Sequence, residues 1–202
     1  MTGNVRIALI PAYEPDNAML DTAAGLKENG FEVVIVNDGS GAVYEQVFKA
    51  AAEYAHILSH EVNRGKGSAI KTGLKYISDI YDAPYTVVCV DADGQHKISD
   101  AVRVCDIASV KRDTLILGSR RFTGSVPFRS RFGNTVTRFV YRLTSGVKVY
   151  DTQTGLRAFA SELVPYLTEI PGERYEYEMN VLMEYAKSGT KITEVPIRDR
   201  KS

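Results

Sequence analysis

Two acidic residues, separated by one position, follow a short apolar segment near the middle of the chain. Residues 85–90 (YTVVCV) are typical of a buried strand, and Asp91 and Asp93 come directly after them in the sequence DADGQH. Two carboxylates at this spacing repel each other unless a positive charge lies between them. Hard cations such as Mg2+ and Mn2+ bind through one or two carboxylates together with substrate phosphates. The pattern therefore predicts a metal site, to which Gln95 or His96 could add a ligand; the alternative is a turn in which an aspartate caps the next helix.

Polar clusters also follow four other short apolar segments. These clusters are PAYEPD (11–16), NDGS (37–40), NRGKG (63–67) and GSRR (118–121). In an open parallel sheet, ligands bind at the carboxyl ends of the strands. Together with DADGQH, the clusters therefore predict one binding site along one edge of a sheet.

Two of these clusters have residues suited to a nucleotide. Asp38 in NDGS could accept hydrogen bonds from a ribose hydroxyl or a base edge, although Asp-Gly also favours a plain turn. The glycines of NRGKG allow the backbone to approach a phosphate, and Lys66 could meet its charge. The chain has neither a Walker A motif nor a GxGxxG after the first apolar segment, which argues against a dinucleotide-binding enzyme.

Basic residues gather after residue 110, although the chain as a whole is neutral. The 202 residues carry 25 basic and 25 acidic side chains, so net charge gives no general attraction to nucleic acid. Residues 111–148 nevertheless contain nine basic residues and one acid. Arg120, Arg129 and Arg131 suit a phosphate because guanidinium binds it bidentately. The segment is interpreted either as a site for an anionic ligand or as a solvated basic face.

Three further acids lie towards the end of the chain. Asp151, in the polar sequence YDTQTG, could position an acceptor or accept a proton, or could simply form a turn. Glu176 and Glu178 stand where a helix is expected to begin, and acids there suit the helix dipole.

Apolar strands alternate with helical patterns along most of the chain. We expect strands at 5–11, 31–36, 56–59, 85–90, 114–117, 155–160 and 191–195, and helices at 16–29, 42–54, 67–80, 98–110, 132–144 and 176–187. This order predicts an α/β fold with a mainly parallel sheet flanked by helices. Because no repeat or linker is visible, residues 1–202 are expected to form a single domain.

The two cysteines, Cys89 and Cys105, lie in apolar segments without a CxxC partner. They are interpreted as buried, reduced thiols of a cytosolic protein. The N-terminus shows no secretory signal, and no apolar stretch approaches the roughly 20 residues needed to cross a bilayer.

Taken in order, PAY, NDGS, NRGKG, DADGQH, GSR, RSRFGN and DTQTGLR resemble the family 2 glycosyltransferases. The nearest subgroup is that of dolichyl-phosphate mannose synthase and the bacterial polyprenyl-phosphate sugar transferases. The resemblance covers residues 5–201. It implies the Rossmann-like GT-A fold and an inverting, metal-dependent transfer from a nucleotide-diphosphate sugar to a polyprenyl (dolichyl or undecaprenyl) phosphate.

The resemblance also implies roles for individual residues. The nucleotide would be bound by Pro11, Tyr13, Asp38, Lys66, Asp91 and Arg200. Mg2+ or Mn2+ would be ligated by Asp91, Asp93 and Gln95. Arg120 and Arg131 would meet the acceptor's phosphate, and Asp151 matches an acidic residue near the reacting centre.

Two features depart from the family pattern. Many relatives have an acid two residues after the tyrosine of PAY, where this chain has Pro15, so the nucleoside contact made there is in question. Members of the subgroup often continue into transmembrane helices or dock on the membrane, whereas this chain ends in the basic sequence RDRKS. We expect either a membrane anchor beyond residue 202 or a naturally short peripheral enzyme, with the catalytic domain at the cytoplasmic face of the membrane.

Three other functions are weighed against this one. A family 2 enzyme with a sugar-hydroxyl acceptor, building capsule or O-antigen polysaccharide, would need Asp151 or Glu176 as a base. A non-catalytic nucleotide-sugar binding module is disfavoured by the intact DADGQH. A nucleotidyltransferase is disfavoured because PAYEPD lacks a glycine-rich, basic signature. The sugar, the nucleotide and the oligomeric state are left open.

Overall fold

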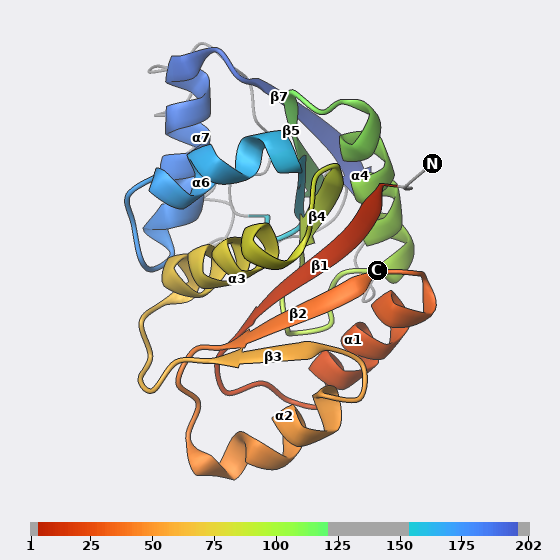
Figure 1. Ribbon diagram of the computed structural model, residues 1–202, viewed down its shortest axis with the longest axis vertical. Helices are drawn as coiled ribbons and strands as arrows, with labels where there is room; N and C mark the ends of the chain where they lie inside the picture. Colours follow the sequence, from red (N-terminus) through yellow and green to blue (C-terminus); the bar gives the residue numbers. More distant parts are fainter. Residues whose placement is uncertain (1–3, 121–153, 198–202) are drawn as a thin grey trace.

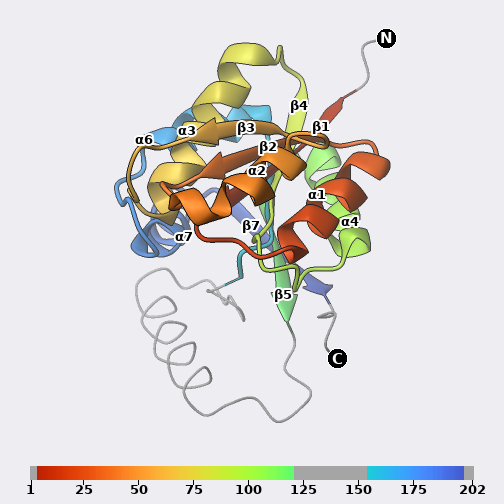
Figure 2. The ribbon, with the colours of Figure 1, turned by 90° about the horizontal axis from the view of Figure 1, so that it is seen from below.

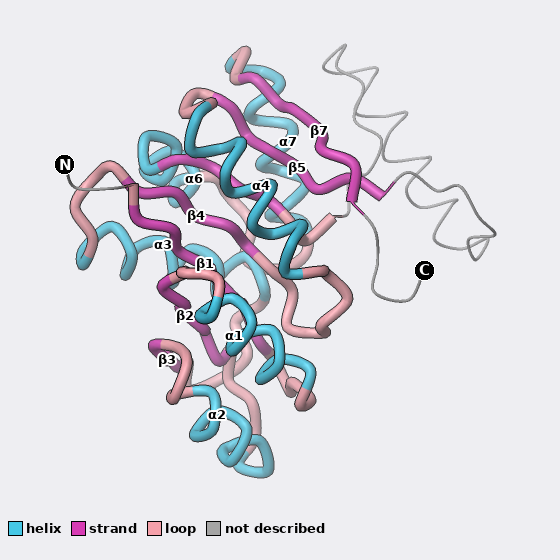
Figure 3. The backbone as a smooth tube through the Cα atoms, turned by 90° about the vertical axis from the view of Figure 1, so that its right-hand side faces the viewer, coloured by secondary structure: helices cyan, strands magenta, loops and turns pink. Residues whose placement is uncertain are grey.

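A seven-stranded sheet forms the centre of the protein, with helices on both faces (Figure 1). The computed structural model describes residues 4–120 and 154–197, and for Arg120 the backbone only. The strands lie in the order β3 (His56–Ser59), β2 (Glu32–Asn37), β1 (Val5–Ala12), β4 (Tyr85–Cys89), β6 (Arg157–Ala160), β5 (Thr114–Arg120) and β7 (Lys191–Ile197). Figure 3 shows the strands side by side from β3 to β7.

The sheet is mainly parallel. Within the described part of the chain, β6 is the strand that runs against its neighbours, since it pairs antiparallel with both β4 and β5, and the remaining pairs are parallel. The predicted α/β class with a mainly parallel sheet is therefore confirmed. The opposite direction of β6 was not predicted, because periodicity identifies a strand but not its orientation.

The described helices are α1 (Ala18–Glu28), α2 (Glu45–Ala51), α3 (Lys66–Ile80), α4 (Ile98–Val110), α6 (Val164–Glu169) and α7 (Glu176–Ser188). Short 3-10 turns, η1 (Ala42–Tyr44) and η2 (Ser161–Leu163), precede α2 and α6. Helix α6 was not predicted; it is six residues long and has a proline in its first turn, where the missing N–H costs no hydrogen bond. The predicted helix at 132–144 lies outside the described residues.

Two apolar cores hold the helices against the sheet. On β1, Ile7 and Leu9 belong to one core and Ala8 and Ile10 to the other, because successive side chains of a strand point to opposite faces. The first core takes residues from α3, α6 and α7, and the second from α1, α2 and α4. Figure 2 shows α3, α6 and α7 on one side of the sheet and α1 and α4 on the other.

Both cysteines lie in these cores. Cys89 and Cys105 are buried and free, as predicted, and burial raises the pKa of each thiol to about 12. A thiol with this pKa stays protonated at neutral pH and is a poor nucleophile. The cysteines are therefore part of the packing.

The strand order places a switch point beside β1. The chain passes from β1 to β2 and β3 on one side, and then returns to form β4 on the other side. In open α/β sheets, ligands bind in the crevice outside the carboxyl ends of the strands at such a point. A ligand site is therefore expected among the segments that follow β1, β2 and β4.

Candidate active site

A cavity of about 490 Å3 opens at the carboxyl ends of β1, β2 and β4. Its walls bring together six of the residues singled out from the sequence: Pro11, Tyr13, Asp38, Lys66, Asp91 and Asp93. The expectation that the strand-end clusters meet at one edge of the sheet is thus correct for PAYEPD, NDGS, NRGKG and DADGQH. In the fifth cluster, GSRR, Gly118 and Ser119 belong to β5 itself and do not follow it.

Asp38 joins the wall of the cavity to the loop before α3. The side chain is buried, and its carboxylate accepts hydrogen bonds from the backbone N–H groups of Arg64 (2.9 Å) and Gly65 (2.7 Å). Gly65 has φ +100°, a conformation that favours glycine. The loop NRGKG is therefore shaped around Asp38.

Asp91 is surrounded by positive and polar groups. Its Oδ1 accepts a hydrogen bond from Lys66 Nζ at 2.7 Å, and its Oδ2 lies 3.5 Å from Nε2 of the buried His96. Gly155 packs against the same carboxylate so closely that a Cβ there would come within 1.9 Å of Oδ2. Burial by itself raises the pKa of Asp91, but His96 and Lys66 outweigh burial and hold that pKa well below its usual range. Asp91 is therefore ionised at neutral pH.

Lys66 connects Asp91, which is partly buried, to a buried acid, Glu178 of α7. The distance from Lys66 Nζ to the Glu178 carboxylate is 3.2 Å, and Arg157 Nε lies 3.7 Å from the same carboxylate. Burial by itself lowers the pKa of Lys66, but the carboxylates of Asp91 and Glu178 outweigh burial and raise it. Lys66 is therefore a charged ammonium group in the wall of the cavity.

The structure separates the roles of the two acids at the start of α7. Glu176 accepts the backbone N–H groups of Glu173 and Arg174, which fits the expectation of an acid at a helix N-terminus. Glu178, by contrast, is 9% exposed and belongs to the charge network around Lys66. The helix dipole alone therefore does not explain why an acid stands at position 178.

Asp93 differs from Asp91 in its surroundings. It is exposed at the cavity, and its Oδ1 accepts the backbone N–H of Gln95 at 3.0 Å. The alternative in which an aspartate caps α4 is wrong, because α4 has Lys97 at its N-cap position and no side-chain cap. Asp93 is thus open to a ligand in the cavity.

The donor set suits a hard divalent cation that is bound together with a phosphate ligand. Asp91 and Asp93 both line the cavity and offer carboxylate oxygens. Within residues 4–120 and 154–197, no group of three or more His, Cys, Asp and Glu side chains is arranged to hold a metal. Two protein carboxylates leave most of the coordination sphere to phosphate and water, which is the arrangement that Mg2+ prefers. Of the two further candidate ligands, His96 contacts Asp91, and Gln95 lies in the turn after Asp93, where its backbone N–H donates to Asp93.

Several predicted residues fall outside this description. Arg131, Asp151 and Arg200 lie outside the described residues, as does Arg129. Arg120 ends β5, and its side chain is not among those described. Their assigned roles stay predictions.

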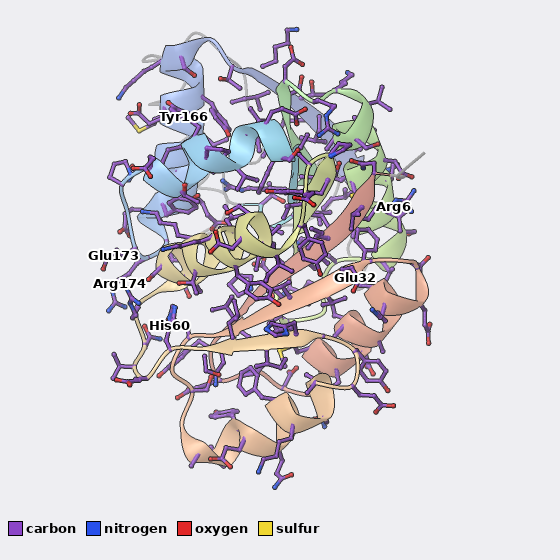
Figure 4. All side chains as sticks on the ribbon, in the orientation of Figure 1. Arg6, Glu32, His60, Tyr166, Glu173 and Arg174 are labelled. Carbon is purple, nitrogen blue, oxygen red and sulfur yellow. The ribbon has the colours of Figure 1, made fainter. Side chains whose placement is uncertain are left out.

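The sequence did not point to one wall of the cavity. Arg174 and Tyr175, in the loop before α7, line the cavity, and Tyr175 is 79% exposed. The carbonyl of Glu173 accepts the backbone N–H of Ser68 at 2.8 Å, which fixes this loop against the start of α3. Figure 4 shows Glu173, Arg174 and His60 on the same side of the molecule. No local pattern identifies such residues, because their partners are about a hundred positions away in the sequence.

Comparison with known proteins identifies the family. Residues 8–164 match the family described as Glycosyl transferase family 2. The chain is 31% identical over 196 residues to the uncharacterised protein MJ1222 of Methanocaldococcus jannaschii, covering 94% of this chain and 79% of that protein. It is 28% identical over 211 residues to the UDP-N-acetylglucosamine–dolichyl-phosphate N-acetylglucosaminyltransferase of Methanococcus voltae, covering 94% and 83%.

The fold also resembles that of a solved glycosyltransferase. Glucosyl-3-phosphoglycerate synthase from Mycobacterium tuberculosis, crystallised with Mn2+, UDP-glucose and phosphoglyceric acid, superposes with a TM-score of 0.71 at 20% identity, covering 98% of this chain and 73% of that one. The chain belongs to glycosyl transferase family 2, and it is a glycosyltransferase with the GT-A fold. The predicted family, fold class and enzyme class are confirmed. None of the helices in the described residues is both long and apolar enough to span a bilayer.

Proposed function

We propose that this enzyme transfers a sugar from a nucleotide-diphosphate sugar to a polyprenyl phosphate, dolichyl or undecaprenyl, with inversion at the anomeric carbon. The observation that carries the proposal is the similarity, over 94% of the chain, to a relative named for transfer to dolichyl phosphate. The cavity at the carboxyl ends of β1, β2 and β4 supports it, because it gathers groups suited to a nucleoside, a diphosphate and a cation.

On the donor side, each group in the cavity has a distinct task. Pro11, Tyr13 and Asp38 would hold the nucleoside. Lys66, charged and 2.7 Å from Asp91, would lie beside the diphosphate. Arg200, in the basic sequence RDRKS, would bind the diphosphate.

Asp91 and Asp93, with Gln95, would hold Mg2+ or Mn2+. When bound, the cation neutralises the negative charge that develops on the leaving diphosphate. Of the two carboxylates, Asp93 has fewer competing protein contacts, since Asp91 also contacts Lys66 and His96.

In the transfer step, a phosphate oxygen of the acceptor attacks the anomeric carbon of the sugar from the face opposite the leaving group. A bond forms between that oxygen and the carbon, the bond from the carbon to the diphosphate breaks, and nucleoside diphosphate departs. The second pKa of a phosphate monoester is about 6, so the acceptor is largely a dianion at neutral pH and needs little help from a base. Arg120 and Arg131 would therefore act mainly by positioning the acceptor, with Asp151 beside the reacting centre.

The proposed acceptor implies where in the cell the enzyme works. A polyprenyl phosphate is held in a membrane, so the catalytic domain, which we take to be the single domain 1–202, would work at the cytoplasmic face of that membrane. The membrane follows from the acceptor class, and the cytoplasmic face from the two free cysteines, which are typical of a cytosolic protein.

The proposal is tested by following sugar into lipid. The purified chain is incubated with labelled UDP- and GDP-sugars, Mg2+ or Mn2+, and either a polyprenyl phosphate or the matching polyprenol in detergent. We expect label in the lipid extract for one donor with the polyprenyl phosphate, no label with the polyprenol, and an inverted anomeric configuration. Transfer to sugar-hydroxyl acceptors with none to polyprenyl phosphate would instead support the capsule or O-antigen alternative.

A further inference from the structure

His60 links the cavity wall to helix α3 and was not singled out from the sequence (Figure 4). Its Nδ1 lies 2.7 Å from Asp38 Oδ1, and its Nε2 lies 2.9 Å from Thr72 Oγ1. The side chains of His60 and Asp38 are 5% and 4% exposed. A carboxylate is only an acceptor, so Nδ1 of His60 donates, and Nε2 of a neutral ring then accepts the Thr72 hydroxyl. Thr72, His60 and Asp38 thus form a chain of hydrogen bonds from α3 to the cavity.

This chain limits what Asp38 can still accept. A carboxylate has about four acceptor positions, two on each oxygen. Oδ1 accepts from His60 Nδ1 and from the Arg64 N–H, and Oδ2 accepts from the Gly65 N–H. Counting the donors of residues 4–120 and 154–197, one acceptor position, on Oδ2, is left. Because Asp38 lines the cavity, a ligand there can donate one hydrogen bond to it.

Nucleobases differ in the donors that they offer. Uracil has a single N–H at N3, between two carbonyl groups. Cytosine has its donor at N4 and a lone pair at N3, so a carboxylate placed opposite N3 repels it. Guanine has two adjacent donors, N1–H and N2–H, and both can pair with one carboxylate only when both of its oxygens are open. A base whose donor is left unpaired in a closed site is rejected.

We propose that His60 is a positioning residue that occupies Asp38 Oδ1 and so makes the site select uridine nucleotides over those of cytosine and guanine. The inference rests on the proposed function, because it requires that Asp38 contacts the base of the donor nucleotide. Beyond the proposed function, it specifies uridine as the nucleoside of the donor and names His60 as a residue that acts on this choice through Asp38.

The test measures dissociation constants of UDP, CDP and GDP by calorimetry with Mg2+. The variants are His60→Ala, His60→Asn, which keeps an amide N–H near the Nδ1 position, and His60→Gln, whose longer side chain carries its amide away from Asp38. His56→Ala is the matched control, because His56 lies in β3 and stacks on Tyr76 at 4.5 Å.

We expect the wild type to bind UDP at least about 30-fold more tightly than CDP or GDP, a margin set by one charge-assisted hydrogen bond. In His60→Ala the margin over GDP should fall to about 3-fold, since the freed carboxylate can offer both oxygens. His60→Asn and His56→Ala should keep the wild-type margin. If His60→Ala does not fold, His60→Gln takes its place with the same expected loss.

Different failures have different meanings. Wild-type protein that binds no nucleotide overturns the proposed function and this inference with it. Wild-type protein that binds UDP, CDP and GDP alike, or GDP best, overturns the inference and leaves the glycosyltransferase proposal standing. A His60→Ala variant that weakens all three nucleotides equally shows that His60 has a structural role only, which also overturns the inference.

Discussion

Replacing Asp93 by asparagine is expected to reduce metal-dependent sugar transfer by about three orders of magnitude while leaving the fold intact. Asp93 is exposed, and an asparagine oxygen can still accept the N–H of Gln95, so the free energy of unfolding should change by less than about 0.5 kcal/mol. The variant loses a negative ligand for the cation that stabilises the leaving diphosphate. We expect kcat/KM to fall by roughly 1000-fold, as when one preorganised electrostatic contact to a transition state is removed.

Asp79→Asn is the matched control for this experiment, since Asp79 is an exposed acid of α3 outside the cavity. It should keep wild-type turnover and wild-type stability. The activity of both variants is measured over a range of Mg2+ and Mn2+ concentrations. Turnover of Asp93→Asn at the wild-type rate and with the same metal dependence would show that Asp93 is not a metal ligand.

Replacing Lys66 by methionine is expected to cost both stability and donor binding. The side chain of Lys66 is 18% exposed and lies between the carboxylates of Asp91 and Glu178, at 2.7 and 3.2 Å. Methionine fills much of the volume but leaves Asp91 without its ammonium partner. Removing one partner of a fully buried ion pair costs about 3 kcal/mol or more, and this pair is partly buried, with Asp91 27% exposed. We therefore expect a loss of about 2 kcal/mol, which is a drop in melting temperature of roughly 4–8 °C for a chain of this size.

Two comparisons separate charge from packing in the Lys66 experiment. Lys75→Met makes the same chemical change at an exposed position of α3 and should shift the melting temperature by less than about 2 °C. Adding Asp91→Asn to Lys66→Met should restore part of the lost stability, because it removes the unpaired charge. A double variant less stable than Lys66→Met would contradict the ion-pair explanation.

The sheet and the strand-end clusters could be predicted from the sequence because their signals are local. The segment that became β4 is buried along its whole length, as its apolar composition indicated, and DADGQH follows it. Strand ends were less predictable: β5 continues to Arg120, three residues past the expected end at 117. Its last residues, Gly118 to Arg120, pair with β7, a partner that comes more than 70 positions later in the chain.

The positive group that stabilises the Asp91 carboxylate could be predicted only in part. Two acids this close were expected to have a positive charge between them. The structure gives Asp91 a positive neighbour, Lys66, within the protein and leaves Asp93 exposed. Glu178 and Arg157, which complete the charge network, come from segments distant from Lys66 in the sequence. Contacts of this kind depend on the tertiary fold, and a single sequence does not reveal them.

Donor binding is best measured through the melting temperature of the purified chain with UDP- and GDP-sugars, each with Mn2+, with Mg2+, or with EDTA. A ligand that binds only the native state at 100 times its dissociation constant adds about 2.7 kcal/mol, or roughly 5–10 °C here. We expect such a rise for UDP-sugars with a divalent metal and its loss in EDTA. Equal melting temperatures under all of these conditions would contradict the assignment of the cavity as a metal-dependent nucleotide-sugar site.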